Sequence, residues 1–379
     1  MSKIKSKKNN IFKDFLESER IGGNLLIFAT ILSLLLTNVF IGENFSKIWH
    51  ISFGHFSIAH IVNDGLMTVF FLLVGLELER EIYIGELSNI KKALLPIIAA
   101  IGGMFAPALI HFCFNFDTNT VAGAGIPTAT DIAFSLAILS LFSKKVPNSL
   151  KIFLTALAIA DDLGAIFVIA IFYTKTISWF YLLGSLLVFC ILLIMNRLKV
   201  KVVEVYLLVG AIMWVLMLNS GIHATITGVM LAFAIPFTKE QNISISLQEK
   251  LHKPVAMFIL PIFALVNTSI YLGEDLFSHL LSNNNYGIFF GLVFGKPIGI
   301  LLFTSIAVLL NISKLPNDLK WSHIIGASFF AGIGFTMSIF VSGLAFDDTI
   351  LIQFSQITVL ISSLVAVILG SVWFRYFVK

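Results

Sequence analysis

Four ionisable residues lie in the middle of long apolar runs of this sequence: Asp131, Asp161, Asp162 and Lys296. A charged side chain at the depth of a membrane costs about 2.5 to 3.5 kcal/mol, so each of these residues needs a partner, water or a function. A carboxylate can hold either a proton or a hard cation that prefers oxygen ligands, and the two occupancies exclude each other. These residue types therefore predict a site at which cations and protons compete.

The spacing of Asp161 and Asp162 indicates different surroundings for the two acids. Adjacent residues on a helix point about 100° apart, so one acid can face Lys296 while the other faces a water-filled cavity. A purely structural interpretation is that Lys296 neutralises one aspartate only to hold helices together. Three acids facing one base leave an excess of negative charge, which favours the functional interpretation.

The composition places these residues in a membrane protein. Of the 379 residues, 58% are hydrophobic and only 12% are charged, whereas an ordinary globular domain is roughly 25% charged. The net charge of +4 is too small and too dispersed for a nucleic-acid-binding surface. We predict twelve helices that cross a hydrocarbon core of roughly 30 Å, near residues 21–40, 58–77, 93–115, 121–143, 150–174, 178–196, 202–218, 220–236, 254–272, 286–310, 322–345 and 350–376.

The basic residues set the orientation of these spans. All but three of the 25 lysines and arginines fall in alternate loops, which the positive-inside rule assigns to the cytoplasm together with both termini. The exceptions are Lys47 and Lys175 in outer loops and Lys296 within the tenth span. The expected organisation is a cytoplasmic segment at 1–20, one transmembrane domain at 21–376 and a cytoplasmic C-terminus at 377–379.

Segment 41–56 and the two cysteines are not expected to do chemistry. The segment is too polar to span, so we expect an exposed connection with some extended structure, which is also a candidate contact for a homodimer. Cys113 and Cys190 lie inside apolar runs and lack the paired spacing of a disulfide framework or a zinc site. We interpret both as small core residues.

The fourth and eleventh predicted spans contain helix-breaking residues near their centres. Glycines and a proline occur at 123–127, and two glycines occur at 332–334. Broken helices expose half-helix ends, whose partial charges Asp131 and Lys296 could offset. The alternative is that glycine and proline are simply commoner in membrane helices.

The two interrupted spans occupy matching places in the chain. Each is the middle helix of a group of three, at 93–174 and 286–376. Two such groups of opposite topology predict an inverted repeat with a binding site at its interface.

Six motifs carry a family resemblance: Val69–Glu77 (VFFLLVGLE), Pro127–Phe134 (PTATDIAF), Ala158–Ala165 (AIADDLGA), Gly221–Thr225 (GIHAT), Phe294–Pro297 (FGKP) and Ala331–Ser338 (AGIGFTMS). Together they closely resemble the NhaA-type sodium/proton antiporters over almost the whole chain. The resemblance implies a bacterial inner-membrane antiporter that exports Na⁺ or Li⁺ in exchange for protons, electrogenically and under the control of pH. It implies an all-α polytopic fold of twelve transmembrane helices with inverted three-helix repeats, in which the broken fourth and eleventh helices cross.

The resemblance also assigns roles at the buried charges. Asp161 and Asp162 match the pair that binds Na⁺ and protons, Asp131 and Thr130 support it, and Lys296 is the counter-charge. Whether Lys296 itself carries a proton stays open. No cofactor is implied, and the partners are membrane lipid, monovalent cations and protons.

A second, polar group of residues is implied to modulate activity with pH. Glu77, Arg80 and Glu81 at the inner end of the second span match the family, whereas Glu249 and His252 at the start of the ninth depart from its pattern. His223 and His252 are candidates because histidine titrates near physiological pH. The alternative is an ordinary solvated charged loop, with histidines that are merely hydrogen-bonded. Asp64, near the outer end of the second span, is expected in an entry funnel.

Three rival classes fit the sequence less well. An intramembrane aspartyl protease also needs two aspartates at membrane depth, but Asp131 follows Thr-Ala-Thr rather than a Gly-x-Gly run, and Asp161 and Asp162 diverge. A passive channel gives no reason for a titratable pair with Lys296 at one depth. An ATP-driven pump would need a P-loop, which the sequence lacks.

Overall fold

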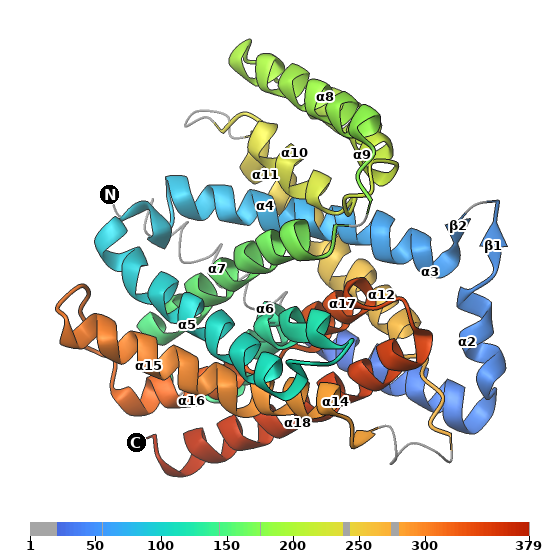
Figure 1. Cartoon of the computed structure of the whole chain (residues 1–379). Coiled ribbons are helices and arrows are strands. Elements are labelled where there is room, and N and C mark those ends of the chain that lie inside the picture. Colours follow the sequence, from blue (N-terminus) through green and yellow to red (C-terminus); the bar gives the residue numbers. More distant parts are fainter. Residues whose placement is uncertain are drawn as a thin grey trace.

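The protein is built mostly of helices (Figure 1). The computed structural model describes residues 21–54, 56–143, 145–174, 176–237, 243–273 and 280–378. The expected cytoplasmic segment 1–20 and the last residue, Lys379, lie outside the described residues.

The first half of the chain contains the helix Ile21–Phe40, whose last turn is η1 (Leu36–Phe40), then α2 (Glu43–Trp49), β1 (Ser52–Phe53), β2 (Phe56–Ser57), α3 (Ile58–His60), η2 (Ile61–Leu66), α4 (Met67–Tyr83), η3 (Glu86–Ser88), α5 (Ile90–Asn115), η4 (Val121–Thr128), α6 (Ile132–Leu141) and α7 (Asn148–Phe172). The second half contains α8 (Trp179–Arg197), α9 (Val203–Leu218), α10 (Ile226–Ala234), α11 (Ile243–Pro254), η5 (Val255–Ile259), α12 (Leu260–Asn267), α14 (Asn283–Phe290), η6 (Gly291–Gly295), α15 (Lys296–Leu309), α16 (Trp321–Ala331), α17 (Phe335–Ala345) and α18 (Thr349–Tyr376).

Within the described ranges, seven helices are long and apolar enough to cross a membrane, and two bent helix pairs raise this number to nine. The predicted span 202–218 corresponds to α9, of 16 residues, whereas α10 has only nine residues. In place of the predicted span 254–272, α11, η5 and α12 form one continuous helix over 243–267. A turn at Gly221, with φ of +87°, ends the run before α10. The chain is an all-α polytopic membrane protein, and the count of twelve spans stays a prediction.

The segment 41–56 is more ordered than expected. It holds the seven-residue helix α2 and, with the next residue, a two-stranded antiparallel hairpin that pairs Ser52 with Ser57 and Phe53 with Phe56. The expectation of extended structure is confirmed, whereas α2 was not predicted because its polar residues do not form an apolar run. A role of this segment in a homodimer stays a prediction.

The interpretation of the cysteines as core residues is wrong. Cys113 on α5 and Cys190 on α8 are both exposed. In a membrane protein lipid tails satisfy an apolar side chain as well as a core does, so hydropathy alone does not tell the two environments apart. The hairpin of α8 and α9, which carries Cys190, lies at the top of Figure 1 and packs against α10 on one side.

Helices α5 and α15 touch backbone to backbone. A Cβ atom built on Gly102 would lie 2.3 Å from the carbonyl oxygen of Gly299, and one built on Gly299 would lie 2.0 Å from that of Gly102. Only glycine permits this approach. The contact brings the start of α15, where Lys296 lies, into the centre of the molecule.

The fourth and eleventh predicted spans are broken, as expected. η4 and α6 meet at 40°, and α16 and α17 meet at 45°. The breaks contact each other: the Asp131 amide donates to the Ile333 carbonyl over 2.7 Å, and the Ser338 hydroxyl donates to the Ile126 carbonyl over 2.7 Å. The two broken spans therefore cross at the depth where the buried charges lie.

Candidate functional site

One aspartate of the α7 pair is bound to the buried lysine. Asp161 Oδ2 lies 2.9 Å from Lys296 Nζ, and neither side chain has exposed surface. Adjacent helical residues diverge, so Asp162, which is also fully buried, points elsewhere. The two acids thus have different surroundings although they are neighbours in sequence.

The broken fourth span completes the surroundings of this ion pair. Lys296 Nζ donates to the carbonyl oxygen of Thr128, the last residue of η4, over 2.5 Å. A cation there offsets the partial negative charge of a helix C-terminus. The Thr130 hydroxyl lies 2.7 Å from Asp161 Oδ2 and 2.8 Å from the Ala331 carbonyl oxygen, and donates its one proton to either of them.

Asp131 joins the N-termini of two half-helices. Its Oδ1 accepts from the Phe134 amide at the start of α6 over 2.9 Å. Its Oδ2 accepts from the amide and the hydroxyl of Thr336 at the start of α17, over 3.2 and 2.5 Å. A carboxylate in this position offsets the partial positive charge of both helix ends. Three donors fix its orientation.

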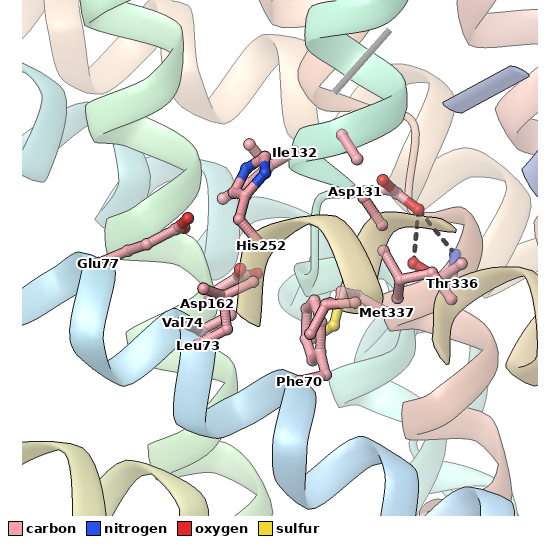
Figure 2. Close-up of a pocket in the computed structure, with 14 residues that line it drawn as sticks. Phe70, Leu73, Val74, Glu77, Asp131, Ile132, Asp162, His252, Thr336 and Met337 are labelled. Carbon is pink, nitrogen blue, oxygen red and sulfur yellow. Dashed lines mark hydrogen bonds between the residues drawn. The ribbon is translucent and has the colours of Figure 1, made fainter. Parts of the chain in front are cut away.

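A cavity lies beside the breaks of the two bent spans, and only some of the predicted site residues line it. Its volume is about 40 Å³, room for a few water molecules, since one needs roughly 10–15 Å³ by the same measure. It is lined by Phe70, Leu73, Val74, Glu77, Asp131, Ile132, Ala133, Asp162, His252, Val255, Ala256, Leu260, Thr336 and Met337. Figure 2 shows Asp162 on one side and Asp131 with Thr336 on the other. Asp161, Thr130 and Lys296 pack behind this lining.

Thr336 was missed by the sequence reasoning as a site residue. Its motif was recognised, but a threonine in an apolar run carries no charge and no hydropathy signal. Its position two residues after the second glycine of the break, Gly334, is the feature that could have indicated it.

Of the residues predicted to modulate activity, some line the cavity and others lie away from it. Glu77 and His252 line the cavity, and Gln248 donates to Glu77 over 3.4 Å. Arg80 and Glu81 form an ion pair with each other at 3.0 Å. Glu249 is exposed on α11.

A buried acid of α4 was also missed. Glu79 is 3% exposed and accepts from the hydroxyl of Ser244 on α11 over 2.5 Å. The sequence places Glu79 in the charged cluster at the inner end of the second span but gives it no role of its own, because such a run is typical of a solvated helix end.

The two remaining predicted residues meet away from the cavity. Asp64 Oδ2 lies 3.2 Å from His60 Nε2, and Asp64 also interacts electrostatically with His223. His223 Nε2 lies 3.0 Å from the carbonyl oxygen of Tyr173, at the C-terminus of α7. Asp64 and His223 therefore form a separate polar group with His60, which was not predicted.

The polar side chains that line the cavity determine what it can bind. Two carboxylates and a hydroxyl are hard oxygen donors, which suit a proton or an alkali cation. Asp162 interacts electrostatically with Asp131, Asp161 and Lys296, so binding at one of these groups changes the field at the others. Among the described residues no cluster of three or more His, Cys, Asp or Glu side chains could hold a resident metal ion.

Comparison with known proteins identifies relatives over the full site. A family model described as Na⁺/H⁺ antiporter 1 matches residues 13–374. The Na⁺/H⁺ antiporter NhaA of Cytophaga hutchinsonii is 56% identical over 375 residues, covering 98% of this chain and 97% of that protein. The Na⁺/H⁺ antiporters NhaA of Flavobacterium psychrophilum and Dechloromonas aromatica are 54% and 53% identical, covering 98% and 100% of this chain and 98% of each relative.

Proposed function

The chain belongs to the Na⁺/H⁺ antiporter 1 family, and from this premise we propose that it exports Na⁺ or Li⁺ in exchange for protons through the cavity that Asp162 lines. Members of the family are secondary transporters, so the chain is an antiporter and not an enzyme. The observation that carries the proposal is the fully buried Asp162 in a small cavity, next to an Asp161 that Lys296 already neutralises.

Competition at Asp162 accounts for exchange. A proton and a cation cannot occupy one carboxylate together, so a cation that enters the cavity releases the proton and a returning proton releases the cation. Asp131 on the opposite wall supplies a second carboxylate to the ion. Two protons move inward for each cation moved outward, one on Asp162 and one on the Asp161–Lys296 pair, so each cycle moves net charge.

We place the end of the cavity marked by Glu77 and His252 on the cytoplasmic side. This orientation follows from the basic residues that flank the end of α4, namely Arg80, Lys91 and Lys92. It corresponds to a protein of the bacterial inner membrane with twelve spans, inverted repeats and both termini in the cytoplasm.

We assign control by pH to the same end of the cavity. Glu77 and His252 share the cavity with Asp162, so a change in the charge of either residue changes the field at the ion site. Arg80, Glu81 and Glu249 act around this pair on α4 and α11. His223 and Asp64 act at the opposite end, where Asp64 belongs to the entry funnel of the outer side.

Proton movement in sealed vesicles tests the function. Na⁺, Li⁺ or K⁺ is added to everted vesicles that hold an imposed proton gradient, at several pH values. We expect Na⁺ or Li⁺ to release protons with the parent protein and Asp162→Asn to lose the response by about a hundredfold or more, since no charged ligand remains at that position. Glu204→Gln, an exposed acid on α9, is the matched control and should behave as the parent. A steady conductance independent of the proton gradient would identify a channel instead.

A further inference from the structure

The hydroxyl of Thr336, the second residue of α17, is directed at Asp131. It donates to Asp131 Oδ2 over 2.5 Å, and the Thr336 amide donates to the same oxygen over 3.2 Å. The side chain is 2% exposed and lines the cavity, so this geometry lies at the site itself (Figure 2).

The contact decides where the second carboxylate of the cavity points. Asp131 Oδ1 is held by the amide of Phe134 and Oδ2 by Thr336, so the plane of the carboxylate is fixed from both ends. The two donors come from different broken spans, α6 and α17. Without the hydroxyl, the longer amide bond alone would hold Oδ2, and the carboxylate could turn about its last torsion.

We propose that Thr336 is a positioning residue for cation binding, which holds the Asp131 carboxylate against the cavity so that it and Asp162 bind one alkali cation from opposite sides. The inference rests on the proposed function and adds a determinant of cation affinity to it.

We expect loss of the Thr336 hydroxyl to weaken cation binding without slowing turnover. Thr336 contributes by ordering a ligand of the bound cation, while protons are carried by other groups. Loss of a hydrogen bond to a charged group is worth about 1.5–3 kcal/mol. The expected result for Thr336→Val is therefore an apparent KM for Na⁺ raised by about tenfold or more, with kcat within about twofold of the parent.

The test uses the full chain, purified and reconstituted in lipid vesicles, with KM and kcat for Na⁺ measured at one pH. Thr336→Ser keeps the hydroxyl and should restore KM to within about threefold of the parent. A KM for Thr336→Val equal to that of the parent, or a Thr336→Ser variant as impaired as Thr336→Val, would overturn the proposal. Equilibrium binding of radioactive sodium to the purified variants gives the same comparison without transport, and Thr336→Ala replaces Thr336→Val if the latter does not fold.

Ser338→Ala is the matched control. Ser338 lies two residues further along α17, is fully buried, and also joins the broken spans, through a 2.7 Å bond to the Ile126 carbonyl, but it does not line the cavity. We expect its KM to stay within about twofold of the parent. An equal rise in KM for Ser338→Ala would mean that any lost link between the spans weakens binding, and the positioning role would be wrong. A parent protein without exchange would overturn the proposed function, whereas an active parent with an unaffected Thr336→Val overturns only this inference.

Discussion

Lys296 and Asp161 neutralise each other at the centre of the molecule, with no exposed surface on either side chain. Replacing both members of such a pair with neutral residues is often nearly without cost, because the desolvation of two charges is avoided. Removing one member leaves an uncompensated buried charge and costs about 3–5 kcal/mol. The contribution of the pair therefore depends on which variant is compared.

We expect Lys296→Met to lower the free energy of unfolding by about 3–5 kcal/mol, because Asp161 is left without its counter-charge. Adding Asp161→Asn should recover most of this loss, since an amide at 161 still accepts from Thr130. Melting temperatures of the single and double variants in detergent measure both effects. A double variant less stable than Lys296→Met would contradict the assignment of the cost to an unpaired acid.

The same Lys296→Met variant tests which group carries the second proton. If exchange that responds to the membrane potential persists, Lys296 is not an obligatory carrier, and both protons belong to the acids. Asp162→Asn measured alongside shows that the remaining flux uses the cavity.

His223 belongs to the polar group that it forms with Asp64 and His60 rather than to the cavity, and its ring bonds a carbonyl at the end of α7. We expect His223→Ala to retain exchange and to shift the pH at which activity is half-maximal, because a titratable group near Asp64 is lost. Initial rates measured from pH 6 to 9 in vesicles report the shift. Complete loss of transport in a correctly inserted variant would show that His223 has a larger role.

The charged residues of the site could be predicted from the sequence, whereas the uncharged polar residue beside them could not. Asp131, Asp161, Asp162 and Lys296 could be found because an ion at membrane depth is rare. Thr336 could not be assigned a role, because a hydroxyl in an apolar run fits lipid, core or ligand site equally well. Which of the adjacent acids faces Lys296 depends on the rotation of α7, and the sequence left that choice open.

Among the helices, the close contact of α5 with α15 determines where Lys296 lies. Lys296 is one turn from Gly299, whose Cβ position is 2.0 Å from a carbonyl oxygen of α5. A Cβ there must push the helices apart, which typically costs about 1–3 kcal/mol. We expect Gly299→Ala to lower the melting temperature and to reduce exchange, because the Lys296–Asp161 distance of 2.9 Å changes with the helix position.

Gly343 provides the control for that substitution. It lies within α17, and a Cβ built there meets no atom within 4 Å. Gly343→Ala should be neutral or stabilise by up to about 1 kcal/mol, because alanine favours a helix. Equal melting temperatures for Gly299→Ala and Gly343→Ala would show that α5 and α15 adjust without cost.

Helix breaks were predictable and short helices were not. Glycine and proline at 123–127 and 332–334 indicate both breaks directly, because they disfavour a continuous helix. The run 220–236 contains no Asp, Glu, Lys or Arg, yet only Ile226–Ala234 is helical, since a turn at Gly221 precedes it. A hydropathy pattern reports the environment of a segment and not where its hydrogen bonds begin.

Buried aromatic side chains of α4, α12 and α17 pack together near the centre of the molecule. The rings of Phe71, Phe263 and Phe340 lie in contact, with centroids 5.5 Å apart for Phe71 and Phe340 and 6.3 Å for Phe263 and Phe340. All three are at most 3% exposed. Asn63 on η2 and Asn267 at the end of α12 exchange two amide hydrogen bonds, over 3.1 and 2.7 Å. These contacts link α12 to η2, α4 and the broken eleventh span.

Net charge movement is the property of the whole cycle that the membrane potential can test. Two protons inward for one cation outward move one elementary charge, and each 100 mV then contributes about 2.3 kcal/mol to cation export. This corresponds to a roughly fifty-fold larger cation gradient at equal proton gradient. We expect initial Na⁺-dependent proton fluxes to fall when valinomycin and equal K⁺ concentrations clamp the potential at zero with the proton gradient held constant. Unchanged fluxes would mean that one proton is exchanged for one cation, and that the Asp161–Lys296 pair keeps its proton throughout the cycle.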